Sequence, residues 1–263
     1  MGLPDHKDEN SRGAPTRNCV VHLLGGLYVT QSGCRIEVPE GCKRLLAFLA
    51  LRRGRVERCH AAGTLWSSVD DRRAAGNLRS VLWRLRCAEI DVLEADKRSV
   101  GLRHGVVVDV LEVAEWAARL IAQRPLPEDL SLSRPFADAL DLLPGCYDDW
   151  AIIERERMRQ RMLHALEALS RAMTTMGRYG EAVDAAMTAI SVEPLRESAQ
   201  RALLEAHMAE SNLSEARRNF LAYRNLVRSE LGVEPSVELA ALVRWRLSRG
   251  PQACSSGPVA ATV

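Results

Sequence analysis

One stretch of the sequence, AAGNLRSVLWRLR (residues 74–86), combines arginine, asparagine, serine and tryptophan with a stripe of leucines. Arginine side chains hold phosphates and pair with the O6 and N7 atoms of guanine, and asparagine pairs in a similar way with adenine. In a helix, four apolar residues would fall within about 100° on one side: Leu78, Val81, Leu82 and Leu85. The pattern therefore predicts a helix that packs on a core with its leucines and meets a polyanion with its other sides.

The polar sides of this helix, together with the residues just before it, contain the candidate binding groups. They are Arg72, Arg73, Asn77, Arg79, Ser80, Trp83, Arg84 and Arg86. We expect the helix to enter a major groove, with some of these side chains at base edges and the flanking arginines at phosphates on either wall. Trp83 would lie against sugar and backbone or against a thymine methyl group.

Two of these assignments have an alternative that involves the protein alone. Trp83 can pack against a neighbouring hairpin as a partly buried side chain. Arg79 and Arg86 can pair with Glu89 or Asp91, which lie just beyond the helix. The sequence leaves both alternatives open.

Basic residues are concentrated around this helix, although the whole chain is nearly neutral. The formal net charge of the 263 residues is +2, but residues 43–86 contain eleven Lys and Arg and three acidic residues, a local charge of +8. Such a local excess on a neutral chain is typical of a surface that binds a polyanion.

Other functional classes lack their motifs. The sequence has no phosphate-binding glycine loop, no HExxH and no GxSxG, so we expect no enzymatic activity and no cofactor. Its seven cysteines are scattered and form no CxxC pair, which argues against a disulfide framework and against a metal site. We find neither a secretory signal nor an apolar run of membrane-spanning length, and we expect a cytoplasmic, nucleoid-associated protein.

The elements around this helix follow the order of a winged helix-turn-helix. Three short strands are expected between residues 19 and 39. Three helices follow, at residues 43–53, at residues 58–66 and at the arginine-rich stretch, where Asp70 or Asp71 is the expected N-cap. Short strand-like runs then occur at residues 92–94, 99–102 and 106–110. Residues 19–110 are therefore predicted to form an α+β domain of the OmpR type, which carries an extra N-terminal sheet.

Four further basic residues of this domain are expected to support binding. Lys97, Arg98 and Arg103 lie in the turns of the last strands and would reach an adjacent minor groove or a phosphate. Arg58 begins the second helix, where free backbone N–H groups form a further phosphate site.

Residues 111–248 are expected to be helical and to contain a repeat. Helices are predicted at residues 111–123 and 149–176, and a closing helix at residues 236–247. Between them the sequence matches itself at an offset of 34 residues, so that the corner GRYGEA (177–182) corresponds to SNLSEA (211–216). This period is typical of tetratricopeptide repeats, in which small residues let paired helices pack closely. The segments outside the two domains, residues 1–18 and 249–263, are predicted to be disordered tails.

Six stretches together resemble one family, the actinomycete antibiotic regulatory proteins (SARP), which join a winged helix to a bacterial transcriptional activation domain. They are RLLAFLAL (44–51), AAGTLW (61–66), NLRSVLWRLR (77–86), LLPGCYDDW (142–150), RMLHALEAL (161–169) and ELGVEPSVEL (230–239). The resemblance implies an activator of biosynthetic genes that binds direct repeats in double-stranded DNA near the −35 element and helps to recruit RNA polymerase holoenzyme. It also implies head-to-tail binding of two copies, a possible homodimer on DNA.

Two other functions stay open on the sequence alone. A protein of the same fold can repress transcription, because the outcome depends on where its site lies relative to the promoter. The chain can also be a helical-repeat scaffold whose winged helix binds a protein instead of DNA. A scaffold would tolerate the loss of Arg79 and Arg84, whereas a DNA-binding protein would not.

Overall fold

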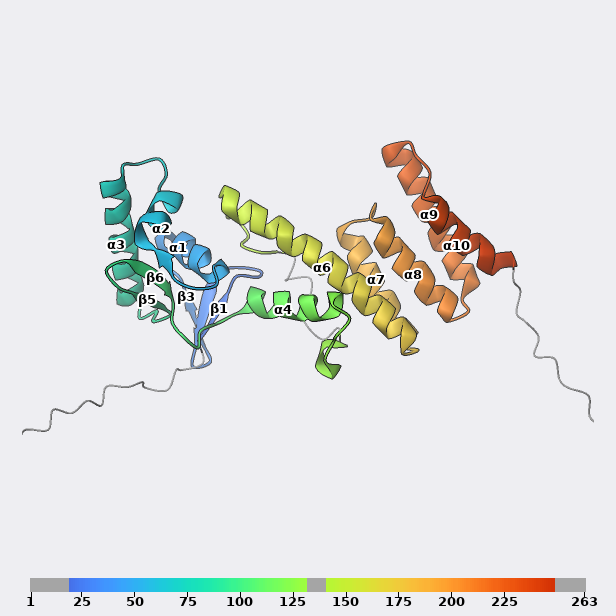
Figure 1. The fold of residues 1–263 in the computed structure, drawn as a ribbon, viewed down its shortest axis with the longest axis horizontal. Coiled ribbons are helices and arrows are strands. Elements are labelled where there is room, and N and C mark those ends of the chain that lie inside the picture. Colours follow the sequence, from blue (N-terminus) through green and yellow to red (C-terminus); the bar gives the residue numbers. More distant parts are fainter. Residues whose placement is uncertain (1–18, 132–140, 249–263) are drawn as a thin grey trace, which may run out of the picture. The chain divides into compact units, whose positions relative to one another are not determined.

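The computed structural model describes residues 19–131 and 141–248, and these divide into two compact units (Figure 1). Unit 1 comprises residues 19–115 and 141–158, and unit 2 comprises residues 116–131 and 159–248. The tails predicted at both ends of the sequence lie outside the described residues.

Unit 1 begins with three antiparallel strands, as predicted. They are β1 (Cys19–His22), β2 (Tyr28–Gln31) and β3 (Cys34–Glu37), which pair in sequence order. Val21 of β1 lies opposite Val29 of β2, and both side chains are fully buried. The tight turn before β3 depends on Gly33, whose φ of 83° is unfavourable for residues with a side chain.

The run predicted at residues 106–110 does not belong to the wing. It forms β7 (Val107–Val108), which pairs in parallel with β1 at the edge of the leading sheet. Asp109 fixes this pairing, because its carboxylate accepts hydrogen bonds from the backbone N–H groups of Leu23 (3.0 Å) and Leu24 (3.2 Å). The predicted run is therefore a strand, and its partner is the first strand of the leading sheet.

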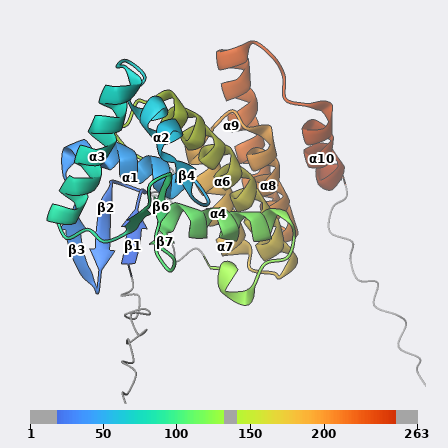
Figure 2. The ribbon, with the colours of Figure 1, turned by 60° about the vertical axis from the view of Figure 1, so that its left-hand side comes forward.

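Three helices and a second sheet complete the winged helix, and they lie together with the leading strands (Figure 2). The helices are α1 (Glu40–Leu51), α2 (Arg58–Leu65) and α3 (Asp71–Cys87). The second sheet has the order β4-β6-β5 and contains β4 (Val56–Glu57), β5 (Leu93–Ala95) and β6 (Ser99–Leu102). The strand β4 was not predicted, because two residues are too few to show an alternating pattern.

The buried face of α3 differs by one residue from the predicted leucine stripe. Its buried residues are Ala74, Leu78, Val81 and Leu85. Leu82 is only partly buried, so its assignment to the core is wrong. Positions 74, 78, 81 and 85 keep the i, i+4, i+7, i+11 spacing of a single helix face. Ala74 extends the buried face by one turn toward the N-terminus of α3.

Unit 2 is helical throughout its regular structure. Two helices, α4 (Asp109–Ile121) and α6 (Asp149–Thr175), begin in unit 1 and end in unit 2. The 3-10 helix η1 (Pro127–Asp129) follows α4. The remaining helices are α7 (Tyr179–Val192), α8 (Glu197–Ala209), α9 (Leu213–Leu231) and α10 (Val237–Ser248). A winged helix followed by a helical domain confirms the predicted fold class.

The 34-residue repeat is visible in the backbone of unit 2. At the two corresponding corners, Gly177 and Ser211 have left-handed φ angles of 75° and 67°. The next residues repeat the same hydrogen bond, from Arg178 N to Met173 O (2.9 Å) and from Asn212 N to His207 O (2.8 Å). Alanines line the contact of α7 with α8, as small residues at these positions predict.

Candidate nucleic-acid interface

The helix α3 is held firmly at its N-terminus. The Asp70 side chain is the N-cap and accepts a hydrogen bond from Arg73 N at 2.9 Å, which satisfies one of the free backbone donors. In the last turn, Arg84 and Arg86 lie near the negative end of the helix dipole. The element that carries most of the predicted contacts is therefore a rigid support for them.

Trp83 is exposed to solvent on the polar side of α3. Its exposed fraction is 66 %, which excludes the alternative in which it packs against the wing. Burying an indole removes a large apolar area from water, and exposed tryptophans are typical of sites that bind a partner. Asn77 lies on the same helix and is partly buried, while Ser80 is exposed and donates a hydrogen bond to Gly76 O (3.1 Å).

Most arginines of α3 have no acidic partner. Within the described part of the chain, Arg72, Arg79, Arg84 and Arg86 are exposed and take part in no ion pair. Arg73 differs, because its guanidinium lies 3.5 Å from the Asp70 carboxylate. The alternative partner proposed for Arg79 and Arg86, Asp91, instead binds Arg103 at 2.7 Å. The unpaired guanidinium groups retain their full capacity to bind an anion.

Arg84 lies over the first turn of α1. A Cβ atom on Gly41 would stand 2.8 Å from the Nη1 atom of Arg84, so only glycine leaves this side chain undisturbed. Burial raises the pKa of the nearby Cys42 thiol, and the positive charge of Arg84 partly offsets this rise. Arg84 therefore extends the basic surface of α3 toward α1.

A hollow of about 520 Å³ brings together three predicted residues from three elements. It is lined by Arg58 of α2, Arg79 of α3 and Lys97 of the turn between β5 and β6. Small residues form its floor, among them Gly63 and Ala75. Asp71 also lines the hollow, so its lining combines three basic side chains with one acidic side chain. The net positive charge is suited to a phosphate of a nucleic-acid backbone.

The β5–β6 turn is built around Asp96. Its carboxylate accepts hydrogen bonds from the backbone N–H groups of Arg98 (2.7 Å) and Ser99 (2.8 Å), and these bonds lower the pKa of Asp96 to about 2. Arg55 closes the turn by binding Asp96 at 2.7 Å and Ser99 Oγ at 2.8 Å. The turn is thereby fixed with Lys97 and Arg98 exposed at its tip.

Two of the predicted basic residues, Arg58 of the hollow and Arg103, also have partners within the protein. Arg58 donates from its backbone to Arg98 O (2.8 Å) and from its side chain to Asp96 O (3.2 Å). Arg103 is bound to Asp91 and donates to Leu93 O at 3.2 Å, away from the tip of the turn. Arg55 could not be singled out from the sequence, because its partners lie about forty residues further along the chain.

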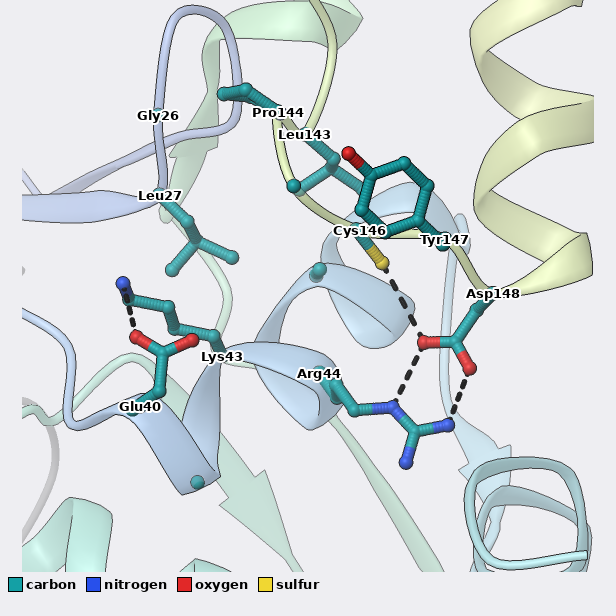
Figure 3. A pocket seen from close by; sticks show the side chains of 13 residues that line it. Gly26, Leu27, Glu40, Lys43, Arg44, Leu143, Pro144, Cys146, Tyr147 and Asp148 are labelled. Atoms are coloured by element: carbon teal, nitrogen blue, oxygen red, sulfur yellow. Dashed lines mark hydrogen bonds and ion pairs between the residues drawn. The ribbon is translucent and has the colours of Figure 1, made fainter.

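A second hollow of unit 1, of about 730 Å³, lies between α1 and the loop LLPGCYDDW (Figure 3). Arg44 of α1 binds both carboxylate oxygens of Asp148, with Nε at 2.8 Å from Oδ2. Lys43 is paired with Glu40 at 2.6 Å, and burial raises the pKa of the Cys146 thiol. The charged groups of this hollow are thus paired with one another, in contrast to those of α3.

Among the described residues we find no cluster of side chains that could hold a metal ion.

The same loop is anchored to the winged helix by backbone and aromatic contacts. Leu143 N donates to Leu23 O at 2.9 Å, and Arg155 donates to three carbonyl groups of the loop. The indole of Trp150 meets the ring of Phe48 edge to face, with 5.5 Å between the ring centres. The motif therefore belongs to the core of unit 1 although it follows α4 in the sequence.

Comparisons with known proteins agree with this arrangement. Residues 133–245 match the family described as bacterial transcriptional activator domain. The fold of the chain is similar to that of EmbR from Mycobacterium tuberculosis, a structure described as in complex with a low-affinity phosphopeptide; the TM-score is 0.66 at 20% sequence identity, over 90% of this chain and 67% of that chain. No curated protein matches the sequence.

The bacterial transcriptional activator domain and the shared fold confirm the predicted resemblance to SARP regulators. The domain characterises a family of transcription regulators, in agreement with the predicted functional class. Its match begins well before α6 and thus includes the loop that packs on the winged helix. In the part of the chain that the structure describes, no helix combines the length and apolar character needed to cross a membrane.

Proposed function

We propose that residues 19–110 bind double-stranded DNA in a sequence-specific manner, with α3 in the major groove. The observation that carries this proposal is the polar side of α3, where Trp83 is exposed and four arginines lack ion-pair partners within the described residues. Unpaired arginines on a rigid helix can approach base edges without first breaking a salt bridge. Lys97 and Arg98, at the tip of the β5–β6 turn, contact the adjacent backbone or minor groove.

The hollow around Arg58, Arg79 and Lys97 supports a phosphate contact beside the groove. A helix in the major groove needs such contacts to fix its register along the duplex. Arg103 and Arg73 are weaker candidates than the sequence indicates, because both lie in ion pairs.

We further propose that residues 111–248 convert DNA binding into activation by contacting RNA polymerase holoenzyme, and that two copies bind head to tail on direct repeats near the −35 element. The match to an activator family supports activation over repression. The biosynthetic genes implied by the SARP resemblance are the proposed targets. In this proposal the protein acts in the cytoplasm, at the nucleoid, and its function requires neither an enzymatic activity nor a cofactor.

Selection from randomised duplex DNA with the full chain tests the DNA-binding proposal. We expect a repeated motif to be enriched, and its affinity to fall steeply between about 50 and about 200 mM salt, because bound arginines release counterions. The Arg79→Ala/Arg84→Ala double variant should enrich nothing. The control is Arg157→Ala, which removes an exposed arginine that pairs with Glu154 of α6. Enrichment of the same motif by the double variant would overturn the assignment of α3.

A further inference from the structure

The last two helices of unit 2 enclose a groove with basic walls and an apolar floor. The groove has a volume of about 410 Å³ and lies between α9 and α10. The residues that α9 contributes are spaced as one helix face: Arg217, Phe220, Leu221 and Arg224. On the other side of α9, Tyr223 and Val227 pack into the core with Leu239 and Val243 of α10. Val243 also lines the groove and Phe220 packs against this core, so the groove lies directly on the core of α9 and α10.

The charge of the groove is unbalanced. Its basic residues are Arg217, Arg224 and Arg244, and its acidic residue is Glu234, which is bound to Arg228. Arg217 is exposed and has no ion pair within the described residues. The Nε atom of Arg224 is buried and has no hydrogen-bond partner there. A buried donor without an acceptor is unfavourable, and no ion pair neutralises Arg224 within the described residues, so its positive charge adds to that of Arg217.

The apolar part of the groove continues onto an exposed surface. Val237, at the start of α10, lines the groove and is 73 % exposed. Leu231 and Val233, in the connection from α9 to α10, are also exposed. Apolar residues next to unpaired arginines are suited to a partner that offers apolar and acidic groups together.

We propose that this groove binds an acidic, amphipathic peptide segment of another protein. Carboxylates of the segment would pair with Arg217 and Arg224, and its apolar residues would cover Val237 and Phe220. Residues 249–263 contain no Asp or Glu, and residues 1–18 combine three acidic with three basic residues, so neither segment has the acidic character that the groove would bind. The inference does not depend on DNA binding by unit 1.

The probe for this surface is a labelled helical peptide with leucines on one face and glutamates on the other, titrated against the full chain without DNA. The control peptide has the same composition in an order that does not segregate the two residue types. We expect the segregated peptide to bind at least tenfold more tightly than its control. Equal binding of both peptides would overturn the proposal, because the groove would then recognise charge alone. Binding of neither peptide would overturn it as well.

Variants locate the binding site on the groove. Arg217→Gln/Arg224→Gln should weaken peptide binding at least tenfold, and Arg217→Gln alone, at an exposed position, should weaken it severalfold without affecting folding. The control is Arg218→Gln, the neighbouring arginine, which pairs with Glu215 and does not line the groove. An equal loss in the control would overturn the proposal. A second result would also overturn it: the peptide fails to bind, and the chain self-associates in a way that the double variant abolishes. The groove would then be an interface between two copies.

Discussion

At the scale of single residues, two groups of arginines do different work. Arg55 and Arg103 are bound to acidic residues and hold the second sheet in shape. Arg72, Arg79, Arg84 and Arg86 are exposed without such partners in the described chain. Composition alone cannot separate the two groups, because the acidic partners lie far away in the sequence. Contact with DNA should therefore depend on the second group, and the geometry of the contact on the first.

Arg79→Ala and Arg84→Ala should each weaken binding to a selected DNA site while the fold stays intact. A guanidinium paired with a guanine contributes about 1–3 kcal/mol to the discrimination against other bases. A guanidinium that binds a phosphate contributes about one unit to the slope of log affinity against log salt concentration. Fluorescence anisotropy over a range of salt concentrations measures both quantities, and circular dichroism checks the fold. Unchanged affinity in both variants would contradict the site.

Asp96→Ala should weaken DNA binding severalfold by releasing the β5–β6 turn. The hydrogen bonds from Ser99 and Arg98 lower the pKa of Asp96 from 3.8 to about 2. The stabilisation of the turn is therefore fully present above about pH 4 and is lost as the pH falls through about 2. We expect the DNA affinity of the parent protein to stay constant from neutral pH to about pH 5. The variant should have a lower DNA affinity, by the same factor, over this range. A variant that binds like the parent would show that the turn makes no contact.

At the scale of elements, local patterns predicted the helices and most of the strands, but neither the strand β4 nor the pairing of β7. The helix α3 begins at the Asp70 cap and shows an apolar periodicity, and both can be recognised in its own segment of the sequence. The two-residue strands β4 and β7 are defined by partners elsewhere in the chain, and β7 pairs with β1 across more than eighty residues. The loop LLPGCYDDW was recognisable as a motif, but its packing on Phe48 depends on contacts that no local pattern contains.

The two central leucines of α3 should differ in their effect on stability. Leu78 is 1 % exposed, and Leu78→Ala should lower the free energy of unfolding by about 2–5 kcal/mol through the cavity it leaves. Leu82 is only partly buried, so Leu82→Ala should cost clearly less. Urea unfolding of both variants measures the difference. A larger loss for Leu82 would restore the leucine stripe predicted from the sequence and contradict the observed face.

Substitutions at the two corners of the repeat, Gly177 and Ser211, should change the stability of unit 2 differently. Gly177 has a φ of 75°, and Gly177→Ala should destabilise unit 2 by about 1–2 kcal/mol because a Cβ atom is unfavourable in this conformation. Ser211 holds the same conformation with a side chain, so Ser211→Gly should be neutral or slightly stabilising. Thermal unfolding of the two variants provides the comparison.

At the scale of the whole molecule, charge and fold divide the functions between the two parts of the chain. The excess of +8 over residues 43–86 lies within the winged helix, on a chain whose net charge is only +2. The matched activator domain supplies most of the remaining residues. The sequence was sufficient to predict this order of folds and the helix α3, which we propose meets DNA. It was not sufficient to predict which arginines are already paired, because ion pairs depend on tertiary contacts.

The most direct test of this account is genome-wide recovery of DNA crosslinked to the protein in its native cell, beside the Arg79→Ala/Arg84→Ala variant. The account predicts sharp peaks at promoters that contain spaced direct repeats, and their loss in the variant at equal protein levels. Peaks that persist in the variant would contradict the role of α3. The absence of peaks for the parent protein would contradict DNA binding itself and favour a protein-binding scaffold.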